Sequence, residues 1–161
     1  ETTQDTKTEE VQVVNLIDDD RIKVDLMGAC DGMLGAEIWF EIENKKDYPI
    51  RIQSRDMSVN GYMENTIMSV DVMPGMKAKD RMIFSNINSI DDLVGVQGKL
   101  WLINNNDVSN DILRSIQIRY PKTSGKITAK TQQWIVVYPD GSEYHFLFDG
   151  YNYRKMPLWN D

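Results

Sequence analysis

Short runs of β-branched residues, each closed by a turn signal, recur along this chain and constrain its fold more than any other feature. Valine and isoleucine together number 28, whereas alanine and leucine together number only 13. β-branched side chains pack well on pleated strands, while alanine and leucine are the stronger helix formers. No segment of 10 residues places its apolar positions at helical spacing. The sequence therefore predicts an all-β protein.

Alternation of apolar and polar residues locates the strands. Residues 36–43 give the clearest example, because Ile38, Phe40 and Ile42 face one way while Trp39 and three glutamates face the other. Turn signals separate about nine or ten such segments at intervals of about 8–12 residues, which is typical of an antiparallel β-sandwich. The other strands are expected at residues 11–17, 21–27, 50–59, 66–72, 77–84, 99–103, 112–119, 133–138 and 143–149.

Glycine, proline and asparagine mark the reversals between these strands. Asn60-Gly61 offers two residues that tolerate positive φ, as a tight hairpin requires. Pro74-Gly75 predicts a type II turn. The glycine-rich segment 28–35 is expected to be a link that permits a sharp reversal. One short helical turn is expected near residues 89–94, because Ser89 suits an N-cap. The last two strands are expected to form an extra C-terminal β-hairpin.

Composition divides the chain into three segments. Residues 1–10 are polar and acidic and begin without a methionine, so we expect a disordered tether from which an upstream segment has been removed. Residues 11–120 are expected to form the sandwich. Residues 121–161 are rich in aromatic residues and are expected to add strands that pack on the same domain.

Charge and cysteine content argue against several classes of function. The net charge is −7, whereas a nucleic-acid partner requires a basic stripe. Lys45, Lys46, Arg51 and Arg55 lie close in sequence, but acidic residues interrupt them, so we expect a solvated surface there. No run of 18 apolar residues is present, so no membrane-spanning helix is expected. The single cysteine, Cys30, forms neither an intramolecular disulfide nor a two-cysteine zinc or redox motif.

Three pieces of the sequence resemble a known family. Glu43-Asn44-Lys45 closes a strand, Ser58-Val59-Asn60-Gly61-Tyr62 forms a hairpin, and Met73-Pro74-Gly75 precedes the next strand. Together they resemble the immunoglobulin-like β-sandwich domains of uncharacterised secreted lipoproteins from Gram-positive, often gut-dwelling, bacteria. The resemblance covers about residues 20–120. It implies an immunoglobulin-like sandwich that is exported and held at the cell membrane by a lipidated cysteine upstream of Glu1, and it implies no catalytic residues.

Residues that carry catalysis or bind metals are few. His145 is the only histidine, and no Gly-x-Ser-x-Gly motif accompanies it. Glu41 and Glu43 share one strand face, an arrangement found in glycosidase acid pairs but also on any solvent-exposed strand. The loops 18–20 and 104–107 are oxygen-rich, but turn chemistry accounts for both, and neither has the spacing of a calcium loop. We therefore expect no enzymatic activity, no metal and no cofactor.

Aromatic residues gather near the C-terminus. Beyond Gly150 lie Tyr151, Tyr153 and Trp159, whose amphipathic rings suit stacking on a sugar or a hot spot for a protein partner. The alternative is that this segment packs across an edge of the sandwich and covers exposed strand groups.

These observations favour a non-catalytic interaction or scaffold module outside the cell. Its expected partner is an extracellular protein or glycan and not nucleic acid, and a lipid anchor is its only expected contact with the membrane. A carbohydrate-binding module that uses Tyr151, Tyr153 and Trp159 is the first alternative. A cell-envelope hydrolase and a purely structural spacer are the others.

Overall fold

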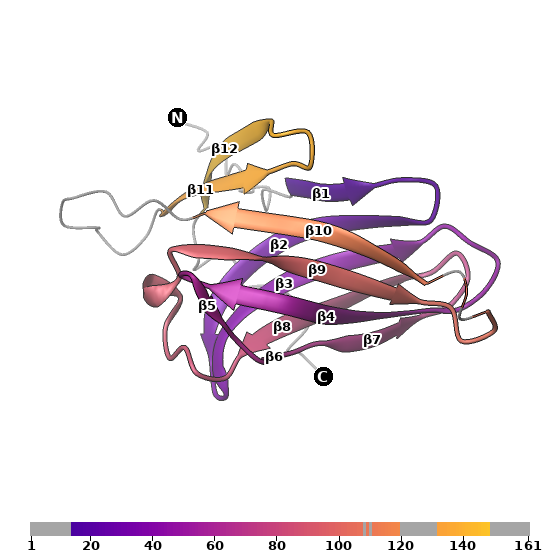
Figure 1. Cartoon of the computed structure of the whole chain (residues 1–161), viewed down its shortest axis with the longest axis horizontal. Coiled ribbons are helices and arrows are strands. Elements are labelled where there is room, and N and C mark those ends of the chain that lie inside the picture. Colours follow the sequence, from indigo (N-terminus) through magenta and orange to yellow (C-terminus); the bar gives the residue numbers. More distant parts are fainter. Residues whose placement is uncertain (1–13, 108, 110, 120–131, 149–161) are drawn as a thin grey trace, which may run out of the picture.

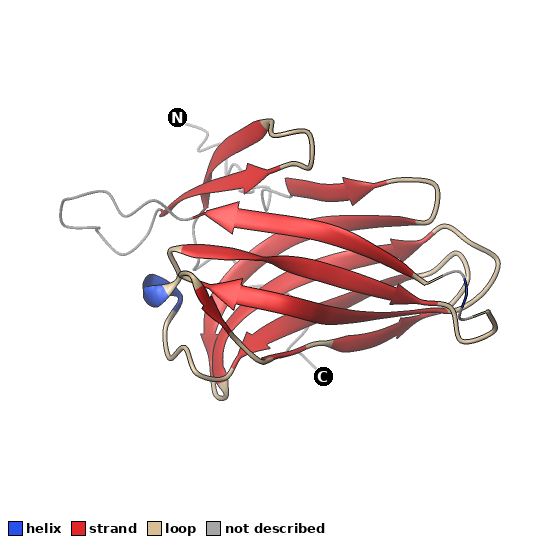
Figure 2. Cartoon of the chain, viewed as in Figure 1, coloured by secondary structure: helices blue, strands red, loops and turns tan. Residues whose placement is uncertain are grey.

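The computed structural model of the chain describes residues 14–107, 109, 111–119 and 132–148. These residues form two antiparallel β-sheets, so the predicted all-β, two-sheet architecture is confirmed. Figure 2 shows strands through nearly all of the described chain, with a short helical turn at one end of the molecule.

The two sheets contain five and seven strands. The order in the five-stranded sheet is β1 (Val14–Asp18), β2 (Ile22–Gly32), β3 (Gly35–Asn44), β8 (Lys77–Phe84) and β6 (Thr66–Ile67). The order in the seven-stranded sheet is β12 (Glu143–Phe148), β11 (Gln132–Val137), β10 (Ile112–Arg119), β9 (Gly95–Ile103), β4 (Ile50–Val59) and β5 (Tyr62–Met63), with β7 (Ser69–Val72) also paired to β4. Figure 1 shows β10, β9 and β4 in front of β2, β3 and β8. The hairpin of β11 and β12 extends the seven-stranded sheet beyond β10, as the predicted C-terminal hairpin requires.

The hydrophobic core fills the space between the inner faces of the two sheets. Ile38, Phe40 and Ile42 of β3 are fully buried there, as their alternation predicts. The seven-stranded sheet contributes buried side chains from alternate positions, among them Ile52, Leu100, Leu102, Ile118 and Trp134. Because alternate residues of each strand enter the core, the residues between them form the two outer faces.

The predicted turns have the backbone conformations that their residues favour. Asn60 and Gly61 have φ angles of 54° and 86°, both positive. Gly75 has a φ of 70°, and the N–H of Met76 donates to the Met73 carbonyl at 3.0 Å, as in a type II turn. The predicted helical turn is η1 (Ile90–Asp92), capped by the preceding Ser89.

The strands differ from the sequence prediction in several places. β9 begins at Gly95, four residues before the expected start at residue 99, and the short strand β5 is not among the expected strands. β2 continues through the glycine-rich segment to Gly32, so the reversal is confined to residues 33–34. Residues 28–31 all have ladder partners on β3, and this pairing outweighs the weak strand preference of glycine and alanine. The expected strand at residues 66–72 is divided, because β6 pairs with β8 in one sheet and β7 pairs with β4 in the other. The described residues therefore form twelve strands.

A bulge in β4 shapes the middle of the seven-stranded sheet. The ladder between β4 and β9 shifts between Arg55 and Ser58, and Asp56 has a φ of 51°. Met57 is buried in the core. Gly98 of β9 makes room for the bulge, since a Cβ built there would lie 2.3 Å from the Met57 sulfur and 2.9 Å from its Cα. The bulge and the glycine therefore depend on each other.

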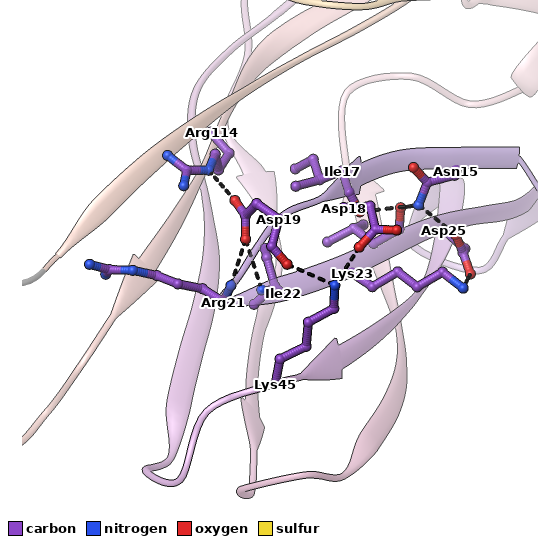
Figure 3. Close-up of polar contacts among 11 residues, drawn as sticks. Asn15, Ile17, Asp18, Asp19, Arg21, Ile22, Lys23, Asp25, Lys45 and Arg114 are labelled. Atoms are coloured by element: carbon purple, nitrogen blue, oxygen red, sulfur yellow. Dashed lines mark hydrogen bonds and ion pairs between the residues drawn. The ribbon is translucent and has the colours of Figure 1, made fainter.

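Polar contacts fasten the two sheets where the turn after β1 meets β10. Asp19 accepts hydrogen bonds from the backbone N–H groups of Arg21 at 2.8 Å and Ile22 at 3.0 Å. Its other oxygen lies 2.6 Å from the Nε of Arg114 on β10 (Figure 3). Burial acts to raise the pKa of Asp19, but the two backbone donors and Arg114 outweigh burial and hold this pKa below its ordinary value. Asp19 is thus ionised at neutral pH and joins the two sheets.

We expect Gly98→Ala to lower the free energy of unfolding by about 1–3 kcal/mol, because the added methyl group collides with the backbone of the bulge. Gly95→Ala on the same strand is the control, since nothing lies within 4 Å of a Cβ built at that position. Urea denaturation of both variants measures the effect. Equal midpoints for the two variants would contradict the proposed dependence of the bulge on Gly98.

We expect Asp19→Asn to lower the free energy of unfolding at pH 7 by about 2 kcal/mol, because it weakens hydrogen bonds made by a charged group. A carboxyl whose pKa is lower in the folded chain stabilises the fold above its unfolded pKa of about 3.9 and loses this contribution as the pH falls. The penalty should therefore be full at pH 7 and should shrink below about pH 4.

Thermal unfolding at pH 7 and pH 3 measures the effect of Asp19→Asn. Asp20→Asn is the matched control in the same turn, because the Asp20 side chain is 77% exposed and its one ion pair among the described residues is with Lys46, at 3.6 Å. Such a surface ion pair contributes little, so the control should unfold like the wild type. An equal loss for Asp19→Asn at both pH values would contradict the role assigned to its charge.

Candidate functional site

The structure separates the titratable residues that the sequence singled out. His145 lies on β12 of the seven-stranded sheet, with its Nε2 atom 3.1 Å from the Glu143 carboxylate. Glu41 and Glu43 lie on β3 of the other sheet, where lysines of β8 are their ladder partners. No catalytic pair therefore forms between His145 and these glutamates. The predicted ligand-binding residues lie outside the described residues: Tyr151, Tyr153 and Trp159.

The two oxygen-rich loops use their polar groups within the protein. Arg114 and two backbone N–H groups engage Asp19, and Lys45 pairs with Asp18 (Figure 3). In the loop 104–107, the Asn104 side-chain oxygen accepts a hydrogen bond from the Asn106 N–H at 3.0 Å. Within the part of the chain that the structure describes, no group of three or more His, Cys, Asp or Glu side chains is arranged to hold a metal ion.

Glu37 on the outer face of the five-stranded sheet is a deeply buried carboxyl group, only 5% exposed. The alternation predicted a solvent-facing position for Glu37 and Trp39, and both are instead buried. Burial raises the pKa of Glu37, against the opposing effects of the Arg81 charge and a hydrogen bond from Trp39. The Nε of Arg81 lies 3.4 Å from the carboxylate, and its guanidinium lies 5.4 Å from the centroid of the Trp39 ring. We interpret these three residues as a structural cluster.

The outer face of the seven-stranded sheet presents aligned polar side chains. Register places the outward residues of β4, β9 and β10 side by side in rows that run across these strands. The successive rows are Gln53–Trp101–Leu113, Arg55–Lys99–Ser115, Ser58–Gln97–Gln117 and Gly95–Arg119. We call this surface the polar face. Figure 1 shows the same three strands at the front of the molecule.

A groove of about 500 Å³ lies at the end of the polar face nearest the β4–β5 turn. Its polar lining includes Ser58, Gln97 and Gln117, and its backbone lining includes Gly61 and Gly95. A Cβ built at either glycine would meet nothing within 4 Å, so the space above both is open. A ligand can therefore approach the main chain closely at these two positions.

Asn60 holds the backbone wall of the groove in place. Its side-chain oxygen accepts hydrogen bonds from the N–H groups of Val94 at 2.7 Å and Gly95 at 3.0 Å. Its side-chain nitrogen donates to the carbonyl of Asp92 at 2.6 Å. These bonds tie the β4–β5 turn to the start of β9. The wall is thus built by local hydrogen bonding and does not depend on a ligand.

The groove offers uncharged donors and acceptors more than charge. Arg119 pairs with Glu143 at one wall. A hydrogen bond from His145 lowers the pKa of Glu143, burial opposes this, and Arg119 adds to the lowering, so Glu143 is ionised at neutral pH and balances the guanidinium. Within the described residues, no hydrogen bond engages the side-chain amides of Gln97 or Gln117, which are exposed and half-buried, respectively.

Sequence reasoning did not find the polar face. Gln97, Lys99 and Trp101 alternate with inward-facing residues in β9, which is the pattern that any half-exposed strand shows. Their proximity to Arg55 and Gln117 comes from strand register across three strands that are far apart in sequence. The only available signal was polar alternation in β4, β9 and β10, and it does not distinguish a binding face from an ordinary solvent face.

Comparison with known proteins adds no candidate. The described residues contain no helix long and apolar enough to cross a membrane. No protein family, curated protein or solved structure that was compared with the chain matches it.

Proposed function

We propose that this chain is a non-catalytic binding module that acts outside the cell, and that its ligand is a polysaccharide held on the polar face. The observation that carries the proposal is the groove with open glycine backbone and two side-chain amides that make no hydrogen bond within the described residues. The resemblance to immunoglobulin-like domains of secreted lipoproteins supports an immunoglobulin-like sandwich, export and a lipid anchor.

The chemistry of the groove suits sugar hydroxyl groups. A hydroxyl group both donates and accepts hydrogen bonds, and a glutamine amide offers both functions. Gln97 and Gln117 are ladder partners, so their amides project from neighbouring strands about 5 Å apart. Ser58, the partner of Gln97 on the other side, adds a hydroxyl group. The row therefore presents uncharged donors and acceptors across three strands.

The length of the polar face suits an extended chain. Trp101 and Gly95 are six positions apart on β9, which corresponds to about 20 Å of strand. Ligands of this length include several linked sugars. The half-buried Trp101 ring at one end and the groove at the other give such a chain two distinct points of attachment.

A protein partner is the second candidate, favoured by a different surface. Tyr62 and Met63 of the edge strand β5 are 75% and 71% exposed. Aromatic side chains and methionine are enriched in protein interfaces, and an edge strand offers unpaired backbone groups. On the polar face, Leu113 and the half-buried Trp101 lie in the row at one end, while the middle rows, one of which lines the groove, present polar side chains, so this face favours the polysaccharide.

We expect the wild-type protein to be retarded in native gels that contain a soluble polysaccharide, tested with dextran, laminarin, xylan and pectin. The double variant Gln97→Ala/Gln117→Ala should bind about tenfold more weakly, because it removes two amide groups from the groove. Asn105→Ala, in the turn just after β9 and away from the groove, is the exposed control and should bind like the wild type.

Two results would contradict this proposal. Retardation by none of the polysaccharides, or equal retardation of the double variant, would remove the groove as a glycan site. A steady rise in reducing ends during incubation with the wild-type protein would instead indicate a hydrolase.

A further inference from the structure

Two positive charges lie directly opposite each other in the middle of the polar face. Arg55 of β4 and Lys99 of β9 are ladder partners, so both side chains project outward from the same row. Like charges at directly opposed positions destabilise a sheet. The arrangement is unexpected in a chain of net charge −7, which has more acidic than basic residues to place there.

Neighbouring cations each have a close carboxylate partner, whereas this pair has only one carboxylate within ion-pair distance in the part of the chain that the structure describes, and it reaches Lys99 alone. On the same face, Arg51 pairs with Asp71 at 2.8 Å and Arg119 pairs with Glu143. The nearest carboxylate oxygen to Lys99 is that of Asp56, at 4.0 Å, the outer limit of an ion pair. Among the described residues, no carboxylate forms an ion pair with Arg55.

The four basic residues that lie close in sequence, at positions 45, 46, 51 and 55, have different surroundings in the structure. Lys45 pairs with Asp18, Lys46 lies 3.6 Å from Asp20, and Arg51 pairs with Asp71. These three side chains behave as the expected solvated surface. Arg55 differs from them, because its neighbour in the ladder is another cation.

Trp101 holds the Arg55 side chain in place. The guanidinium carbon lies 4.7 Å from the centroid of the Trp101 ring. Stacking of this kind restricts the guanidinium group but does not use its N–H donors. A planar guanidinium held in this way is suited to a carboxylate or sulfate group, to which it donates two parallel hydrogen bonds.

The bulge in β4 sets the position of this pair. It begins directly after Arg55, and bulges commonly redirect side chains next to functional sites. Asp56 has a positive φ of 51°, and Gly98 opposite has no room for a side chain. The local backbone is therefore specialised at the row where the two cations meet.

We infer that Arg55, Lys99 and Trp101 form a subsite for the acidic group of an acidic polysaccharide that bears carboxylate or sulfate groups. This inference rests on the proposed polysaccharide-binding function and names its ligand class. Charge complementarity assigns an anion to the row of Arg55 and Lys99. The adjoining row of uncharged amides and the open groove assign a sugar chain, and not an acidic peptide, to the surface beside it.

The test uses two matched pairs of soluble probes. Polygalacturonate is compared with its methyl ester, and dextran sulfate is compared with dextran, so that each pair differs only in the acidic group. Polyglutamate represents an acidic peptide. Titration by isothermal calorimetry uses the full chain at low and at physiological salt, because binding to exposed cations weakens as salt screens the charges.

The decisive variant is Arg55→Gln/Lys99→Gln, which removes two positive charges from the subsite. Lys77→Gln/Lys79→Gln removes the same charge from the outer face of the five-stranded sheet, where both lysines are exposed, and is the control. We expect the first variant to bind the acidic probes at least about tenfold more weakly and the neutral probes unchanged. The control should bind all probes like the wild type.

The single variant Lys99→Gln distinguishes a loss of affinity from a loss of folding stability. Because it removes a like-charge opposition, it should unfold at the same temperature as the wild type or a higher one, while its affinity for the acidic probe falls. A lower unfolding temperature together with unchanged affinity would assign Lys99 a structural role and overturn the inference.

The remaining outcomes separate this inference from the proposed function. Equal binding of acidic and neutral polysaccharides, or an equal effect of both double variants, would overturn the acidic subsite but leave the polysaccharide-binding function intact. Preference for polyglutamate over both acidic polysaccharides would overturn the sugar assignment. Binding of no probe at all would contradict the proposed function itself.

Discussion

Burial of apolar side chains between the two sheets determines where every other side chain of the strands points. Ile52 and Leu102 are ladder partners and are almost fully buried. A slip of one residue in either strand would exchange the buried set for the exposed set, so the core enforces the register. The row that follows, Gln53 beside Trp101, must then face outward. The polar face is in this sense a consequence of the core.

Within the polar face, the bulge in β4 is the point where this alternation changes. Outward positions Arg51, Gln53 and Arg55 would be followed by Met57 if the strand were regular, which would place a methionine on the surface. The extra residue moves Met57 into the core and brings Ser58 outward beside Gln97. Gly98 permits the change because it leaves space against Met57. A glycine at this position of β9 is therefore needed both for the burial of Met57 and for the continuity of the polar face.

The fold was predictable to the extent that it depends on local signals. The turns at Asn60-Gly61 and Pro74-Gly75 have the positive φ angles that their residues favour, and η1 begins after Ser89 as predicted. Local signals failed where pairing decides the outcome. Ladder partners on β3 keep the glycine-rich segment 28–35 in strand conformation as far as Gly32. The expected strand at residues 66–72 is divided because its first part pairs in one sheet and its second part pairs in the other. The candidate site was not predictable for the same reason, because its rows exist only through the register of β4, β9 and β10.

Net charge and ligand charge act on different length scales in this protein. The overall charge of −7 argues against nucleic acid, since that partner needs a continuous basic stripe. At physiological ionic strength, however, charges more than about 8 Å apart are largely screened. A single acidic group that contacts Arg55 and Lys99 therefore experiences these two cations far more than distant carboxylates, and Asp56, 4.0 Å from the Lys99 ammonium group, opposes only one of the two charges. Arg51 and Arg119 attract that group less, because each is already paired with a carboxylate of the protein. An acidic protein can thus bind an acidic polymer, provided that cations which neighbouring carboxylates do not fully neutralise are placed at the point of contact.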